Sequence, residues 1–132
     1  MTTTFGSIVW QDLTVPNATE IKDFYQRVIG WTADDHDMGE YVDYNIRTSP
    51  ESEPIAGICH ARGTNANVPP QWMLYVQVEN ASACAERCLA YGGRIIDGPR
   101  AMGSGTFCVI QDPAGAVLAL ISYATAQNTS LE

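Results

Sequence analysis

The sequence predicts an α+β fold made of two tandem βαβββ modules, which form a curved eight-stranded sheet around a cleft with the helices outside. Short stretches of alternating apolar and polar residues recur along the 132-residue chain and are typical of strands. The segment 15–30 (VPNATEIKDFYQRVIG) aligns with 78–93 (VENASACAERCLAYGG) at an offset of 63 residues, which indicates an internal repeat. Neither half alone would bury both its helix stripe and its sheet, so the two halves are expected to pack side by side.

The first repeat, about 6–61, begins with a strand over 8–15 that leads into a helix. Asn17 is a plausible N-cap, and Glu20 follows three residues later as in a capping box. Gly30 is expected to end the helix in a left-handed conformation. The apolar face of this helix is expected to carry Ile21, Phe24, Tyr25 and Val28. Further strands are expected at 31–37, 40–48 and 55–61.

The second repeat, about 71–123, follows a linker over 62–70 (RGTNANVPP) that has no periodicity. A helix is expected at 80–91, ended by Gly92 and Gly93. Strands are expected at 71–78, 94–96, 105–111 and 116–123, with a tight turn over 112–115. The glycine-rich segment 98–105 (GPRAMGSG) is not a phosphate loop, and we expect a mobile loop over the cleft mouth, from which Arg100 could reach an anionic ligand.

The length and composition suit a single domain over 1–132 with a substantial core, because hydrophobic residues make up 45% of the chain. The net charge of −8 argues against nucleic acid and anionic membranes as partners, since binding phosphate requires clustered Lys and Arg. A transmembrane run and a secretory signal are both missing from the sequence, so we expect a cytoplasmic protein. The four cysteines form no C-x-x-C pair and are expected to be structural.

The duplicated βαβββ pattern resembles the vicinal oxygen chelate superfamily, which includes glyoxalases, bleomycin-resistance proteins and extradiol dioxygenases. The resemblance covers about residues 6–123 and is carried by WQDLTVPNATEIKDFYQRVIGW and GGRIIDGPRAMGSGTFCVIQDPAGAVLALIS. Characteristic features are Phe24-Tyr25 before Gly30-Trp31, then Gly92-Gly93, and Asp112-Pro113-x-Gly115 before the last strand. The first strand places the chain nearest the sub-branch that lacks the metal ligands.

Metal-dependent members of this superfamily hold a divalent ion with His, Gln or Glu on the first and last strands of both repeats. By resemblance, these positions fall at Trp10, at Met73, at Ala119, and at Ala56 or Gly57. None of these side chains suits a hard divalent ion, so the resemblance implies that the metal site has been lost. A slip of one residue would instead bring Gln11 into the cleft as a metal ligand.

Strand alternation places Trp10, Asp12 and Thr14 on the cleft side of the first strand, while Gln11 shares the helix side with Leu13 and Val15. The repeat register brings three more side chains to the cleft. The expected ligand-binding residues are therefore Trp10, Asp12, Thr14, Met73, Tyr75, Gln77 and Ala119. Such a lining fits a small organic ligand, and the alternative is a filled core without a cavity.

The leading functional hypothesis is a glyoxalase/bleomycin-resistance-like protein that binds a small organic molecule in its cleft without a catalytic metal. A second hypothesis is a metal-dependent lyase, isomerase or dioxygenase that uses Zn, Ni, Fe or Mn, held by Gln11 together with His60 or a Glu. A third is a metal-free enzyme with Asp12 or His60 as acid or base; if Ala56 faces the cleft, strand alternation brings Ile58 and His60 to it as well. The resemblance also implies a homodimer.

Overall fold

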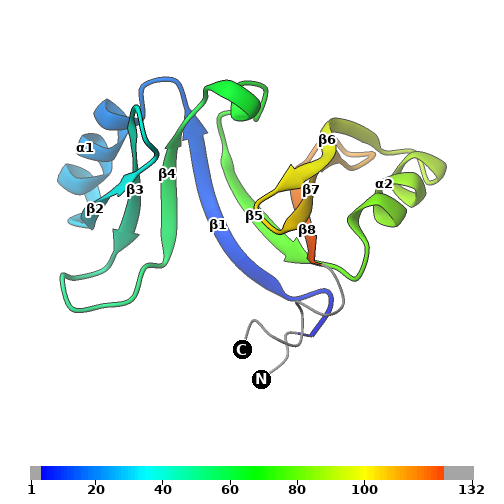
Figure 1. The fold of residues 1–132 in the computed structure, drawn as a ribbon, viewed down its shortest axis with the longest axis horizontal. Helices are drawn as coiled ribbons and strands as arrows, with labels where there is room; N and C mark the ends of the chain where they lie inside the picture. Colours follow the sequence, from blue (N-terminus) through cyan, green and yellow to red (C-terminus); the bar gives the residue numbers. More distant parts are fainter. Residues whose placement is uncertain (1–3, 124–132) are drawn as a thin grey trace. The chain divides into compact units, whose positions relative to one another are not determined.

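The computed structural model describes residues 4–123, which form eight strands and two α-helices. Figure 1 shows their arrangement along the chain. The elements are β1 (Ile8–Val15), α1 (Ala18–Ile29), β2 (Thr32–Asp37), β3 (Val42–Arg47), β4 (Ala56–His60), β5 (Trp72–Gln77), α2 (Ala81–Ala90), β6 (Arg94–Met102), β7 (Gly105–Gln111) and β8 (Val117–Tyr123).

The strands follow the hydrogen-bonded order β2-β3-β4-β1-β5-β8-β7-β6. In each half the first strand pairs in parallel with the last, β1 with β4 and β5 with β8. The remaining pairs within each half are antiparallel. The predicted α+β fold with two tandem βαβββ modules is therefore confirmed.

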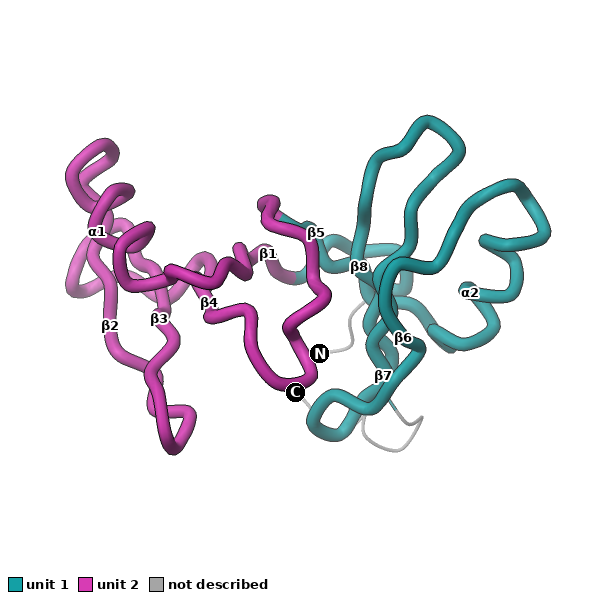
Figure 2. Tube along the Cα trace, turned by 90° about the horizontal axis from the view of Figure 1, so that it is seen from above, with its two compact units in different colours: residues 1–9, 73–132 teal, residues 10–72 magenta. Residues whose placement is uncertain are grey.

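The chain divides into two compact units, shown in different colours in Figure 2. The first-repeat unit comprises residues 10–72, and the second-repeat unit comprises residues 1–9 and 73–132. Strand β1 therefore begins in one unit and continues in the other. The residues that lead into β1 belong to the second-repeat unit. There the N–H of Gly6 donates to the carbonyl of Gln77 at 2.7 Å, and the N–H of Gln77 donates to the carbonyl of Ser7 at 2.9 Å.

In the first-repeat unit, helix α1 packs on one face of the four strands. Leu13 and Val15 of β1 belong to this core, which explains why alternate β1 positions are apolar. Its other buried members are Ala18, Tyr44, Ile46, Ala56 and Ile58. Ile21, Tyr25, Trp31 and Trp72 pack against them and complete the hydrophobic core of the unit.

In the second-repeat unit, helix α2 packs on the sheet through small residues. Ala81 and Ala85 are buried against Cys108 of β7 and Leu120 of β8. Val76 and Val78 pack against the same cluster. The side chains of β5 at positions 73, 75 and 77 consequently lie on the sheet face opposite α2.

The helix ends differ in one respect from the expectation. Gly30 ends α1 in the left-handed conformation, as predicted. Asn17, however, makes no side-chain cap to the helix backbone, and its amide instead donates to Glu20 at 3.1 Å. The cap geometry expected there occurs in α2, where Asn80 accepts the N–H of Ala83 at 2.9 Å.

Two segments expected to be irregular contain regular structure. Strand β6 runs to Met102, so most of the segment predicted as a mobile loop over 98–105 is paired with β7. Arg100 is held there by Asp97 at 3.0 Å and lies over the ring of Phe107. The linker over 62–70 contains a short 3-10 helix at Gly63–Asn65. None of the helices among residues 4–123 is long and apolar enough to cross a membrane.

Candidate functional site

The face of the first-repeat unit opposite α1 carries alternate side chains of β1. Because Leu13 and Val15 are buried on the α1 side, Trp10, Asp12 and Thr14 lie on the opposite face. The parallel pairing sets Gly57 beside Asp12 and Cys59 beside Thr14. Gln11 shares the parity of Leu13, and its amide donates a hydrogen bond to the carbonyl of Ile55.

Asp12 is half-buried and has a glycine as its neighbour on β4. A Cβ built on Gly57 would come within 3.3 Å of the Asp12 Cβ, which is tighter than ordinary van der Waals contact. The absence of a side chain at Gly57 therefore leaves room next to the Asp12 carboxylate.

A second acidic residue of this unit, Asp43, is deeply buried. Asp43 of β3 is 5% exposed, and its Oδ1 accepts the backbone N–H of His60 at 2.9 Å. The same oxygen lies 3.3 Å from His60 Nδ1, so the carboxylate also orients the imidazole ring. The ring of His60 meets the ring of Tyr41 edge to face at 5.8 Å.

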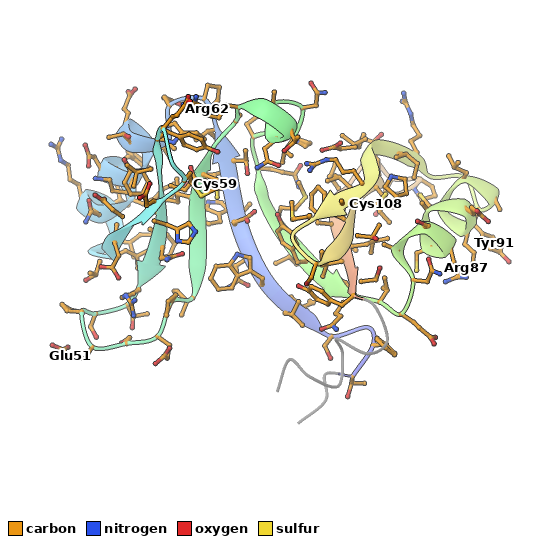
Figure 3. All side chains as sticks on the ribbon, viewed as in Figure 1. Glu51, Cys59, Arg62, Arg87, Tyr91 and Cys108 are labelled. Carbon is orange, nitrogen blue, oxygen red and sulfur yellow. The ribbon has the colours of Figure 1, made fainter. Side chains whose placement is uncertain are left out.

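Cys59 lies between these acidic groups and remains a neutral thiol at physiological pH. Burial raises the pKa of Cys59 far above its ordinary range, and the carboxylates of Asp12 and Asp43 raise it further. A hydrogen bond to Asp43 acts in the same direction. Because the thiolate is the nucleophilic form, this residue is not suited to nucleophilic catalysis at neutral pH. Figure 3 labels Cys59 in the first-repeat unit.

Of the two alternatives for β4, Gly57 rather than Ala56 lies on the face opposite α1. A cleft-facing Ala56 would have placed Ile58 there as well, but Ala56 and Ile58 are both buried in the core beneath α1. The cause is the register, which pairs Leu13 with Ile58 and Asp12 with Gly57. His60 is the last residue of the strand, and its ring lies beside the Asp43 carboxylate.

The face of the second-repeat unit opposite α2 is mainly apolar. Met73 and Ala119 are almost completely buried there, at 1% and 0% exposed, and Gln77 is buried as well. Tyr75 pairs with Ala119, and its ring packs on Phe107 with the ring centres 5.7 Å apart.

The positions that the resemblance assigns to metal ligands do not fit a divalent ion. Trp10 and Ala119 have no donor for a metal, and Met73 offers only a soft thioether. On β4, Gly57 shares a face with Asp12 and has no side chain, so this position contributes no ligand. Among residues 4–123, no group of three or more His, Cys, Asp or Glu side chains could hold a metal ion.

Sequence reasoning placed Trp10, Asp12, Thr14, Met73, Tyr75 and Gln77 on the faces opposite the helices, as the structure does. It missed Asp43 and Phe107. Asp43 is one charged residue in an alternating strand, and only the pairing of β3 with β4 buries it. The apolar strand pattern that contains Phe107 was the one available signal for that residue.

The comparisons with known proteins agree with this architecture. The family model for the Glyoxalase/Bleomycin resistance protein/Dioxygenase superfamily matches residues 5–120. "Putative glyoxylase CFP32" of Mycobacterium tuberculosis is 28% identical over 123 residues, which cover 92% of this chain and 46% of that protein. "Anthracycline biosynthesis protein DnrV" of Streptomyces peucetius is 28% identical over 131 residues, with coverages of 87% and 46%.

The chain thus spans about half the length of these curated relatives. Among solved structures, a variant of Streptomyces coelicolor methylmalonyl-CoA epimerase in complex with 2-nitronate-propionyl-CoA matches with a TM-score of 0.54 and 14% identity. The match covers 92% of this chain and 97% of that one. At this identity the likeness shows the fold.

Proposed function

Because the chain belongs to the Glyoxalase/Bleomycin resistance protein/Dioxygenase superfamily, we propose that it binds a small organic molecule without a catalytic metal. The observation that carries this proposal is the set of side chains at the family's metal positions. Trp10, Gly57, Met73 and Ala119 cannot form the oxygen and nitrogen cage that a hard divalent ion requires.

The faces opposite the helices supply suitable groups for an organic ligand. On the first-repeat unit, the indole of Trp10 lies on the same face as Asp12 and Thr14, which combines an aromatic surface with polar anchors. On the second-repeat unit, Tyr75 supplies the aromatic surface and Gln77 supplies the polar group. One relative is named for anthracycline biosynthesis, and a planar aromatic ligand of that kind would stack on the half-buried indole ring of Trp10.

The proposal is tested first by metal content. Untagged protein purified without chelator is expected to contain far less than one equivalent of Zn, Ni, Fe or Mn by inductively coupled plasma mass spectrometry. A content near one equivalent per chain would contradict the proposal, and the protein would then need to be assayed as an enzyme.

The second test is ligand binding, with an anthracycline as the probe in a thermal-shift and tryptophan-fluorescence titration. Trp10→Ala is expected to weaken binding at least tenfold, because a buried aromatic anchor commonly contributes more than ~1.4 kcal/mol. Phe24→Ala, on the exposed surface of α1, is the matched control and should leave the affinity unchanged. Equal affinities of the Trp10 variant and the parent protein would remove this face from the proposal.

A metal-free acid/base enzyme is the second candidate, and Asp12 is the residue that favours it. Its carboxylate is half-buried beside Gly57 and close enough to Cys59 to raise the pKa of that thiol. An Asp12→Asn variant that keeps ligand binding and loses turnover would support this role. Turnover that survives the substitution would exclude it.

The metal-dependent alternative has less support. It requires Gln11 and His60 to converge on one ion, whereas Gln11 is hydrogen-bonded to Ile55 on the α1 side of the sheet. His60 is oriented by Asp43 at the end of β4.

A further inference from the structure

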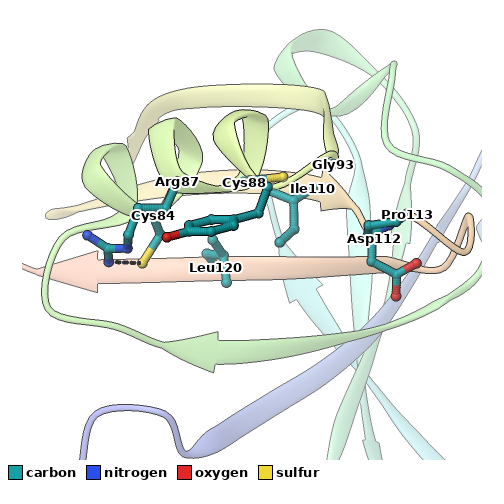
Figure 4. A pocket seen from close by; sticks show the side chains of 9 residues that line it. Cys84, Arg87, Cys88, Gly93, Ile110, Asp112, Pro113 and Leu120 are labelled. Carbon is teal, nitrogen blue, oxygen red and sulfur yellow. Dashed lines mark hydrogen bonds between the residues drawn. The ribbon is translucent and has the colours of Figure 1, made fainter.

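A hollow in the second-repeat unit lies on the α2 side of the sheet, away from the face described above. Its volume is about 460 Å³, within the range of small-molecule sites. Helix α2 contributes Cys84, Arg87 and Cys88 to the lining, and the strands contribute Ile110 and Leu120 (Figure 4).

The internal repeat explains why this hollow exists. At the offset of 63 residues, Cys84 corresponds to Ile21 and Cys88 corresponds to Tyr25. The structure supports this register, because the first helix residues, Ala18 and Ala81, are both 0% exposed. Helix α2 therefore carries two small thiols where α1 carries a branched aliphatic side chain and a phenol ring.

In the first-repeat unit, the protein's own side chains fill the corresponding space. The ring of Tyr25 packs against Trp31 and Trp72, with ring centres 5.7 and 5.5 Å away. Its hydroxyl accepts the indole N–H of Trp72 at 3.1 Å. Ile21 packs against the same core. The hollow beneath α2 therefore lies at the position that corresponds to the Tyr25 ring of the first repeat.

Neighbouring residues of the second-repeat unit do not fill the hollow. Gly93 cannot carry a side chain, because a Cβ there would lie 2.5 Å from Cys88 Sγ and 2.8 Å from the carbonyl oxygen of Gln111. Leu89 is 58% exposed. Tyr91 is one of the residues that line the hollow, but it is 80% exposed, so it forms part of the wall and is not buried there.

The hollow also has a positive end. Figure 4 shows Arg87 and Cys84 at one end, where the guanidinium donates to Cys84 Sγ at 3.2 Å. Among the described residues, Arg87 forms no ion pair with a carboxylate. Asp112 lies at the other end (Figure 4), and its Oδ1 accepts the N–H groups of Ala114 and Ala116 within its own turn.

We propose that this hollow is a binding site for a small aromatic carboxylate. The ligand's ring takes the place that the Tyr25 ring has in the first repeat, against Ile110 and Leu120. Its carboxylate pairs with the guanidinium of Arg87. The site is independent of the proposed ligand face, because it involves the opposite surface of the sheet.

The probe for the test is 4-hydroxyphenylacetate, whose ring matches a tyrosine side chain. Titration into ¹⁵N-labelled protein is expected to shift the amide signals of α2 and of Ile110 and Leu120. Cys88→Tyr and Cys84→Ile, which copy the first repeat, should each abolish these shifts because they fill the hollow. Leu89→Tyr adds the same ring on the exposed side of α2 and should leave binding intact.

The charge requirement is tested separately. Arg87→Gln is expected to weaken the carboxylate about three- to fivefold, the size typical of an exposed ion pair. Arg27→Gln, at an exposed position of α1, is the matched control. The neutral probe 4-hydroxyphenylacetamide should bind the parent protein as weakly as the acid binds the Arg87 variant.

Three results would overturn the proposal. The first is a set of amide shifts that maps outside α2 and its underlying strands. The second is an equal affinity of the parent protein for 4-hydroxyphenylacetate and for its amide. The third is binding that both Cys88→Tyr and Cys84→Ile leave undiminished. Each variant's amide spectrum also shows whether it is folded, and two refilling positions keep the test decisive if one of them is not. Trp10→Ala should leave this binding unchanged, which separates the site from the proposed function.

Discussion

At the scale of single residues, the most informative group is the cluster of Asp43, Cys59 and His60. A lone cysteine and a charged residue in a strand carry no signal that they will meet. They meet because β3 pairs with β4 in an antiparallel register that sets Tyr44 opposite Ile58. Burial and two nearby carboxylates then keep the Cys59 thiol protonated.

The state of Cys59 leads to a prediction about alkylation. Asp43→Asn removes one negative charge and the carboxylate that accepts the thiol hydrogen bond, so the pKa of Cys59 should fall. It should remain above its ordinary value, because burial is the largest cause of the shift. The rate of iodoacetamide labelling of the Cys59 peptide, followed by mass spectrometry between pH 7 and about 10, measures the change. Asp23→Asn on the surface of α1 is the control, and identical profiles for Asp43→Asn and the parent would contradict the assignment.

Cys108 leads to a prediction about stability and pH. Burial raises the pKa of Cys108 from 9.0 to about 11, with smaller contributions from Cys88, Asp97 and Cys84. Above pH 9 the unfolded chain loses this proton while the folded chain keeps it, so the free energy of unfolding should fall as the pH rises toward 11. Urea denaturation from pH 8 to 11 measures the slope. Cys108→Ala should show a shallower fall, and parallel curves for the two proteins would contradict the prediction.

At the scale of elements, the sequence predicted both α-helices and all eight strands of residues 4–123 but misjudged some of their ends. The length of β6 illustrates the reason. Gly98 and Pro99 are typical of a loop, yet the strand continues to Met102 because it pairs with β7 across two register shifts. Local composition does not predict that long hairpin. The pairing of β6 with β7 overrides the loop preference of Gly98 and Pro99.

The two helix caps provide a matched pair for an experiment. Asn80→Ala should lower the free energy of unfolding by ~1 kcal/mol, because the bond from the N–H of Ala83 is lost. Asn17→Ala should cost less, since the Asn17 side chain does not cap the backbone of α1. Equal losses in chemical denaturation would show that the Asn80 bond does not stabilise α2.

At the scale of the whole molecule, the duplication is the central feature. It accounts for the order of elements in both units. It also allows each residue of one repeat to be compared with its counterpart in the other. The comparison of Tyr25 with Cys88 rests on that symmetry. Family membership, shown over residues 5–120, follows from the same pattern.

The expected homodimer is a prediction at this scale, taken from the family resemblance. Size-exclusion chromatography with light scattering should give twice the chain mass of 14.3 kDa at micromolar concentration. A mass equal to that of the single chain across the accessible concentration range would rule out a stable dimer.

The sequence by itself determined the βαβββ repetition, the alternation of β1, and the presence of Trp10, Met73 and Ala119 at positions where the resemblance places metal ligands. These features depend on local periodicity and residue chemistry, which a linear pattern records. Only the tertiary structure decided that Gly57 rather than Ala56 lies beside Asp12, that Asp43 meets His60, and that a hollow remains beneath α2. The reason is that parallel pairing joins strands more than 40 residues apart, and a shift of one residue in that pairing exchanges the two faces of a strand.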